Sequence, residues 1–151
     1  MRSKLMPPTY FLILIVLSTI LHFVLPIKKV IFPPYTYSGI LLISFGGVLN
    51  LWTDALFKKM KTRVKPYEDA SELITQGSFR ISRHPMYLGM TAILIGIALL
   101  HGTIITFFFP VLFFIICEVF FMGFEEKSME KNFGQRYLDY KKKVRRWIWL
   151  S

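Results

Sequence analysis

Four long apolar segments divide the chain, and polar stretches separate most of them. They run from about 10 to 26, 35 to 57, 85 to 101 and 103 to 124. About 20 apolar residues are enough for a helix to cross the hydrocarbon core of a bilayer, where backbone polar groups must be satisfied internally. The pattern therefore predicts an all-α integral membrane protein with about four transmembrane helices in one domain, 1–151.

Small residues recur at helical spacing on two of these segments. The second segment includes them among Gly39, Ile43, Gly46, Gly47 and Asn50, and the third has Gly89, Ala92 and Gly96. Small side chains let the backbones of two membrane helices approach closely. We therefore expect both faces to be helix-packing surfaces rather than ligand grooves.

Two polar regions complete the pattern. Residues 58–84 show no sustained apolar period and contain Pro66 and Gly77, so we expect an ordered or partly helical connector. The helix of the fourth segment is expected to continue through the acidic pair that follows it, with Gly134 as a left-handed cap.

In the tail after the fourth segment, apolar residues recur at steps of three and four. This spacing predicts an amphipathic interfacial helix over 125–149, anchored by Trp147 and Trp149. These apolar positions are Phe133, Tyr137, Tyr140, Val144 and Trp147.

Composition supports the membrane assignment, since 54% of the residues are hydrophobic and 17% are aromatic. The net charge of +10 does not indicate nucleic-acid binding, because the 19 Lys and Arg residues flank the apolar segments. Only Lys28 and Lys29 lie in the loop between the first two segments, whereas the others lie at the N-terminus, in the connector and in the tail. By the positive-inside rule, both termini are predicted to be cytosolic, with the basic tail against membrane lipid headgroups.

Candidate chemistry gathers at the start of the third span. The motif Arg83-His84-Pro85-Met86-Tyr87-Leu88-Gly89 opens that span, and Glu125-Glu126 follows the fourth. Almost no loop joins the two spans, so they should form an antiparallel hairpin. We therefore expect Arg83 and His84 to lie close to the acidic pair, on the cytosolic side.

Three motifs in this order resemble the isoprenylcysteine carboxyl methyltransferase family and its prokaryotic relatives. They are Thr75-Gln76-Gly77-Ser78-Phe79-Arg80 with the Arg83–Gly89 motif, the acidic pair, and Phe133-Gly134-Gln135-Arg136-Tyr137-Leu138-Asp139-Tyr140-Lys141. The resemblance covers about the last 80 residues, while the first two spans match only as apolar segments. It implies a membrane-embedded methyltransferase that takes S-adenosylmethionine from the cytosol and a lipid-like or amphipathic substrate from the bilayer.

The resemblance also implies which residues contact the cofactor. Phe79 stands where many members have Tyr. An arginine that eukaryotic members use for the substrate carboxylate corresponds here to Phe121, a departure that concerns the acceptor and not the cofactor. The implied cofactor contacts are Ser71, Glu72, Leu73, Ile74, Phe79, His84, Pro85, Tyr87 and Glu125.

The residue types themselves suit this donor. Glu125 could bind its ammonium or ribose hydroxyls, the helix start at Pro85 offers free N–H groups to an anion, and Phe79 or Tyr87 could stack on adenine. Methyl transfer needs an aligned nucleophile and exclusion of water, and no metal site is predicted.

Arg83 and Glu118 are the candidates for catalysis. Glu118 lies inside the fourth span, seven residues before Glu125, and an ionisable group at that depth is a candidate functional residue. The alternative is a polar contact from Glu118 to Asn50 or Asp54. A carboxylate acceptor would need no base, whereas an amine or thiol would need one, such as His84 or Glu118.

Three other functions remain open. A sterol-type NADPH reductase shares a His-Pro-x-Tyr-x-Gly start, but this chain has Met86 and Met90 at the two distinguishing positions. A phospholipid N-methyltransferase shares the acidic pair, although its usual Gly-x-Gly motif is not found. A non-enzymatic membrane scaffold would bind no cofactor.

Overall fold

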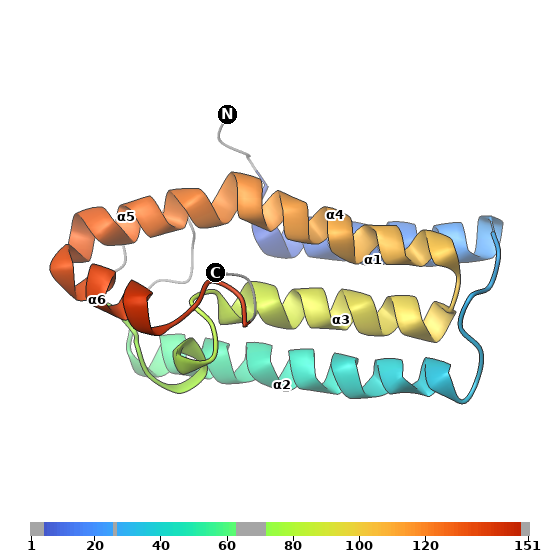
Figure 1. Ribbon diagram of the computed structural model, residues 1–151, viewed down its shortest axis with the longest axis horizontal. Coiled ribbons are helices and arrows are strands. Elements are labelled where there is room, and N and C mark those ends of the chain that lie inside the picture. Colours follow the sequence, from blue (N-terminus) through green and yellow to red (C-terminus); the bar gives the residue numbers. More distant parts are fainter. Residues whose placement is uncertain (1–4, 26, 63–71, 149–151) are drawn as a thin grey trace.

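The computed structural model describes residues 5–25, 27–62 and 72–148, and within them the chain is helical, without a β-sheet. Figure 1 shows α1, α2, α3 and α4 lying along one axis, with α1 beside α4 and α2 beside α3. The helix of α4 continues into α5, which lies with α6 at one end of this bundle. The helices are α1 (Pro7–Val24), α2 (Ser38–Lys59), α3 (Pro85–His101), α4 (Phe108–Ile116), α5 (Gly123–Phe133) and α6 (Gln135–Lys143), with shorter turns η1 (Tyr35–Tyr37), η2 (Gly77–Arg80) and η3 (Ile104–Phe107) and a π-helical segment η4 (Cys117–Met122).

Length and hydropathy make this a multi-pass membrane protein. Three helical stretches are long and apolar enough to cross a bilayer, namely Pro7–Val24, Tyr35–Lys59 and Ile104–Phe133. The shorter α3 is also apolar, and its 17 residues measure about 26 Å. Large apolar side chains cover the outside of the bundle, for example Val16, Leu41 and Val111. Such an apolar surface is suited to lipid and not to water.

Glycines bring α2 and α3 into close contact, as their spacing predicts. Gly46 of α2 lies against Gly89 of α3, and Gly39 lies against Gly96. A Cβ atom on Gly96 would come within 2.5 Å of the carbonyl oxygen of Gly39, so neither backbone has room for a side chain. The α2–α3 interface is the most extensive helix pairing among the described residues. The predicted packing surfaces are confirmed except at Gly47, where an added Cβ would meet no atom within 4 Å.

A tight turn joins α3 to the last apolar stretch at the far end of the bundle. Gly102 ends α3 with a φ of +68°, a left-handed conformation that glycine adopts without steric cost. The turn packs on the loop after α1, because Val30 N–H donates to the Gly102 carbonyl at 2.8 Å. The two apolar helices therefore run antiparallel and side by side.

The last apolar stretch is one continuous helix that changes its winding. It passes from α4 through the π-helical η4 into the charged α5 without a break. The predicted continuation of the fourth span into the acidic pair therefore agrees with the structure. The π segment was not predicted from the sequence.

The C-terminal region differs from the single interfacial helix expected over 125–149. The helix breaks at Gly134, whose φ is +54° but whose ψ of −126° lies outside the left-handed helical range, and α6 ends at Lys143. The aromatic stripe packs on protein rather than on headgroups, because Tyr137 and Tyr140 join a buried cluster with Leu56 of α2. Trp147 is also buried, against the core of α3 and α4. Trp149 lies outside the described residues.

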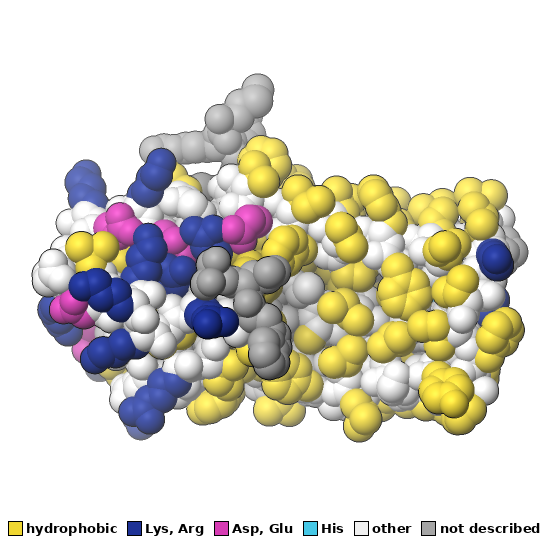
Figure 2. Space-filling view, viewed as in Figure 1, with side chains coloured by type: hydrophobic (Ala, Val, Ile, Leu, Met, Phe, Trp, Pro, Cys, Tyr) yellow, Lys and Arg dark blue, Asp and Glu magenta, His cyan; other side chains and the backbone are white. Residues whose placement is uncertain are grey.

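Charges gather at the α5–α6 end, whereas the rest of the visible surface is mostly apolar (Figure 2). This separation is what a bilayer around α1 to α4 requires, since Lys and Arg are costly in hydrocarbon. Most of the charged side chains visible in this view thus lie at one end of the bundle.

We predict that Gly46→Ala destabilises the protein by about 1–3 kcal/mol, because the added methyl group would force α2 away from α3. The neighbouring Gly47→Ala is the matched control, since a Cβ there meets no atom within 4 Å. It should leave stability unchanged or raise it by about 0.5–1 kcal/mol through the better helix propensity of alanine. Thermal unfolding in detergent measures both variants, and equal midpoints would contradict the packing described here.

Candidate functional site

The start of α3 is built from a short, fully hydrogen-bonded turn. Ser82 is completely buried, and its hydroxyl accepts the backbone N–H of His84 at 3.1 Å. Pro85 occupies the first helical position, where its missing N–H has no intrahelical partner to lose. Leu88 N–H then donates to the His84 carbonyl at 3.1 Å, which closes the first turn. The backbone of His84 is therefore fixed on both sides.

The imidazole of His84 lies between the two carboxylates of α5. Its Nδ1 is 3.2 Å from Glu125 Oε2, and its Nε2 is 3.3 Å from Glu126 Oε1. Tyr87, one turn along α3, donates its hydroxyl to Glu125 and stacks on the His84 ring with centroids 5.6 Å apart. The predicted approach of Arg83 and His84 to the acidic pair is therefore confirmed.

Glu126 is the common acceptor of this cluster, although it is only 3% exposed. Arg146 donates from Nε at 2.9 Å and from Nη2 at 2.7 Å, while Arg83 Nη1 lies at 3.1 Å and Lys141 Nζ at 3.8 Å. These contacts join α5 to α6, to the start of α3 and to the residues after α6. A buried carboxylate is tolerated when it is paired in this way.

Burial by itself would lower the pKa of His84, but the facing carboxylates outweigh it. Hydrogen bonds and charge attraction from Glu125 and Glu126 raise the pKa of His84 above its ordinary value of 6.5. Both ring nitrogens face acceptors, which suits the imidazolium form. In this arrangement His84 is placed as a hydrogen-bond donor to both carboxylates rather than as a base.

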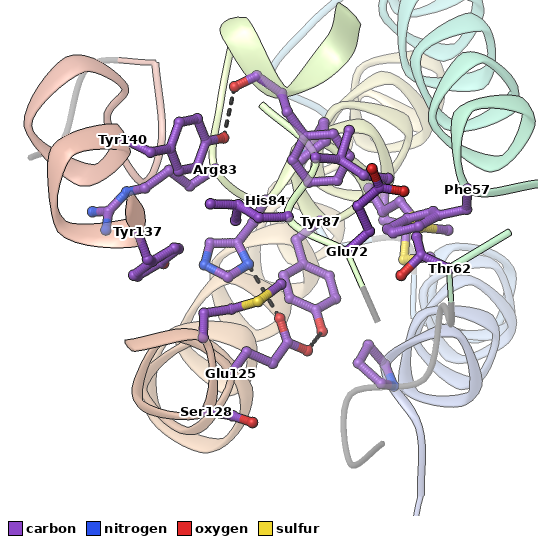
Figure 3. Close-up of a pocket in the computed structure, with 18 of the residues that line it drawn as sticks. Phe57, Thr62, Glu72, Arg83, His84, Tyr87, Glu125, Ser128, Tyr137 and Tyr140 are labelled. Atoms are coloured by element: carbon purple, nitrogen blue, oxygen red, sulfur yellow. Dashed lines mark hydrogen bonds and ion pairs between the residues drawn. The ribbon is translucent and has the colours of Figure 1, made fainter. Parts of the chain in front are cut away.

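A pocket opens beside this cluster, and Figure 3 shows His84, Tyr87 and Glu125 on its wall. Its polar wall also includes Arg83, and α5 adds Ser128. Much of its lining is apolar and comes from the start of α1, the end of α2, the connector, α3, α5 and α6. These apolar and aromatic residues are Met6, Pro7, Pro8, Phe57, Leu73, Ile74, Phe79, Pro85, Met86, Met90, Met129, Tyr137 and Tyr140.

The connector reaches the pocket through contacts on both of its sides. Ser78 accepts a hydrogen bond from Thr53 of α2 at 2.9 Å, and the Phe79 carbonyl accepts the Tyr140 hydroxyl at 2.7 Å. Burial raises the pKa of Tyr137, beside Tyr140, to about 12, so its phenol is neutral near pH 7. The turn η2 is thus held between α2 and α6, and the Phe79 ring faces Phe57 edge-on at 5.6 Å.

The cofactor contacts implied by the family resemblance lie together around this one pocket. Ser71 lies outside the described residues. All the others line the pocket, namely Glu72, Leu73, Ile74, Phe79, His84, Pro85, Tyr87 and Glu125.

Of the two candidates for catalysis, Arg83 lines the pocket and Glu118 does not. Glu118 instead accepts a hydrogen bond from Arg146 and one from Trp147 Nε1, the latter at 2.9 Å. The π-helical η4 explains the difference, because a wider turn changes which residues share a face. Glu118 consequently shares Arg146 with Glu126, eight residues on, rather than facing the pocket with Glu125.

The alternative partners of Glu118 have other environments. Asp54 forms an ion pair with Lys58 at 2.6 Å. Asn50 turns its Oδ1 toward Gly89 and makes no hydrogen bond through that atom within the described residues. Neither residue explains the placement of Glu118.

Several site residues were not singled out from the sequence. Glu126 was expected near His84 but not as the most connected group, and Arg146 was counted only among the basic tail residues. The start of α1, Met6 to Pro8, carries no sequence signal for a pocket. A lone arginine in a basic run has no pattern that distinguishes it from its solvated neighbours.

The chain is similar to an uncharacterized bacterial protein and to two probable methyltransferases of rice. An uncharacterized protein of Haemophilus influenzae is 35% identical over 63 residues. This alignment covers 42% of this chain and all of the Haemophilus protein. The probable protein-S-isoprenylcysteine O-methyltransferases of Oryza sativa subsp. indica and japonica are each 28% identical over 114 residues. Those alignments cover 72% of this chain and 58% of the rice proteins. No solved structure matches the chain.

A family-wide comparison extends these matches across most of the membrane bundle. The sequence model described as phospholipid methyltransferase matches residues 35–136, about two thirds of the chain. The match includes α2, the connector, α3, the continuous last helix and both acidic residues. Together with the rice proteins, it supports the resemblance carried by the three motifs. The chain therefore belongs to the phospholipid methyltransferase family.

Proposed function

We propose that the protein transfers a methyl group from S-adenosylmethionine to a lipid-like or amphipathic acceptor at the charged end of the bundle. The observation that carries the proposal is the convergence of all the described cofactor-contact candidates on one pocket. Family membership supports methyl transfer in general, while the donor and the acceptor are part of the proposal. When bound, the donor supplies an electrophilic methyl group on a sulfonium.

The pocket residues fit the charged part of this donor. Nε of Arg83 is buried without a hydrogen-bond partner among the described residues, while its Nη1 lies 3.1 Å from Glu126, so an N–H group of Arg83 can still serve a carboxylate. Glu125 retains some exposure, with 19% of its side chain accessible, and can receive an ammonium. Glu125 lies at Nδ1 of the His84 ring, whereas Arg83 and Nε2 of the same ring share the Glu126 carboxylate. An amino-acid group could therefore meet both charges.

The remaining walls suit the uncharged parts of the two substrates. Phe79, Leu73 and Ile74 form a buried apolar face on which an adenine ring can pack. Met6, Met86 and Met90 also line the pocket, the last two from the membrane helix α3, and flexible thioethers adapt to irregular hydrocarbon. We propose that the acceptor enters from the side lined by these methionines.

The two candidate bases, His84 and Glu118, are not placed to deprotonate an acceptor, and this limits which reactive group the acceptor can carry. Both ring nitrogens of His84 already face carboxylates, and Glu118 is hydrogen-bonded to Arg146 and Trp147 outside the pocket. Among the described pocket residues, this arrangement favours an acceptor that arrives as an anion and needs no deprotonation, such as a carboxylate. Phe121, where eukaryotic relatives have an arginine, is fully buried, so any anion must find its cation elsewhere.

A phospholipid amine is the second candidate acceptor, because the family model is that of phospholipid methyltransferases. Incubation with labelled donor and a total lipid extract, followed by identification of the product, separates the two acceptors. We further propose that the charged end and both termini face the cytosol, where the donor is made. The basic residues concentrated there support this orientation.

Glu125→Gln should lower the affinity for S-adenosylhomocysteine by at least about tenfold, because the proposed binding mode pairs the ammonium of this ligand with the Glu125 carboxylate. Asp139→Asn is the matched control, because it removes the same charge from an exposed position on α6. Calorimetric titration of detergent-purified protein measures both. NADPH is titrated in parallel, and its binding in place of the methyl-donor product would favour a reductase, while binding of neither would favour a scaffold.

The charge of His84 predicts a pH dependence of stability. Because its pKa is raised in the folded protein, the ion pairs contribute fully below about pH 6.5 and are lost as the pH rises through the folded-state pKa. The thermal midpoint should therefore fall as the pH rises above 6.5. His84→Gln should flatten this slope, and an identical slope in both proteins would contradict the assignment of an imidazolium.

A further inference from the structure

Residues 144–148, which follow α6, return to the start of α3 and contact it through their backbone. The chain turns at Val144, which has extended backbone angles. The carbonyl of Arg145 accepts the N–H of Arg83 at 3.0 Å. The carbonyl of Arg146 accepts the Ser82 hydroxyl at 2.7 Å. We call residues 144–148 the C-terminal segment.

The Ser82 contact extends directly to the pocket. The Ser82 oxygen that donates to Arg146 also accepts the backbone N–H of His84 at 3.1 Å. A single relay of hydrogen bonds therefore connects the C-terminal segment to the residue that carries the imidazole. Because Ser82 is completely buried, water does not compete for these bonds.

The side chain of Arg146 connects the same segment to the opposite wall. Its guanidinium donates twice to Glu126, at 2.9 and 2.7 Å, and once to Glu118. Trp147 donates to Glu118 at 2.9 Å and packs on Phe114 of α4 with ring centroids 4.8 Å apart. The segment is thus attached to α4, η4 and α5 as well as to α3.

We propose that Arg146 is a positioning residue that holds His84 and Glu125 at the separation required to bind the methyl donor. Its backbone holds the turn that carries His84, and its guanidinium holds Glu126, the neighbour of Glu125 on α5. Arg146 and Glu118 do not line the pocket, so they act through other residues. This inference rests on the proposed function, since it concerns the same donor pocket.

The planar guanidinium is required because two carboxylates eight residues apart on one continuous helix must be bridged at once. Arginine presents several N–H donors in a fixed fork, whereas a lysine ammonium is a point charge that would serve one carboxylate well. The π-helical η4 supplies the second carboxylate, because it places Glu118 beside Glu126. Arg146, the carboxylates of Glu118 and Glu126, and the π-helical η4 therefore act together to join the two walls of the pocket.

The test compares Arg146→Gln, Arg146→Lys and Lys142→Gln in calorimetric titrations with S-adenosylhomocysteine. Lys142 is a matched control, since its exposed ammonium lies on α6 and pairs with Asp139 at 3.7 Å. Arg146→Gln should weaken binding by about tenfold or more, Arg146→Lys should recover part of that loss, and Lys142→Gln should match the wild type.

A double-mutant cycle separates positioning from a general loss of stability. If Arg146 acts through His84, Arg146→Gln should cost much less affinity in the His84→Gln background than in the wild type. Wild-type affinity in Arg146→Gln, or strictly additive losses in the cycle, would overturn the proposal. If Arg146→Gln does not fold, Glu118→Gln replaces it, with a smaller loss expected and an unchanged affinity overturning the proposal.

The wild-type titration distinguishes this inference from the function on which it rests. A wild-type protein that binds no S-adenosylhomocysteine refutes the methyltransferase proposal and the positioning role together. A wild-type protein that binds while the Arg146 and Glu118 variants bind equally well refutes the positioning role alone.

Discussion

The burial of one carboxylate constrains the charged end of this protein. Removing an ionised side chain from water costs several kcal/mol unless cations and hydrogen-bond donors replace the lost hydration. Glu126, 3% exposed, obtains them from Arg83 and His84 at the start of α3 and from Arg146 after α6. Because these partners come from separate parts of the chain, satisfying Glu126 requires three segments to meet. The pocket forms beside that meeting point.

The membrane helices make this meeting possible by keeping the distances short. Gly39 and Gly96 let α2 and α3 pack with their backbones in contact, and the turn at Gly102 brings the last apolar helix back alongside α3. An apolar bundle alone has little preference for one vertical register of its helices. The polar contacts at its end provide that preference, since a shift along the axis would leave buried charges unpaired.

A pocket placed at this boundary can meet two kinds of molecule. Its charged wall, with Arg83 and Glu125, suits a small zwitterion from the aqueous side, while its methionine-rich wall continues toward the bundle. The imidazolium of His84 belongs to the charged wall and is held by hydrogen bonds rather than free to exchange a proton. Binding and alignment are therefore the main contributions these residues can make to methyl transfer.

The sequence by itself determined the apolar segments, the glycine faces of α2 and α3, and the approach of His84 to Glu125, because these follow from local periodicity and from a hairpin with almost no loop. Tertiary structure alone decided the partners of Glu118, the burial of Trp147 and the role of Arg146. The π turn of η4 and the return of residues 144–148 arise from contacts between distant segments. No local pattern of residues encodes such contacts, since an amphipathic stripe looks the same whether lipid or protein covers it.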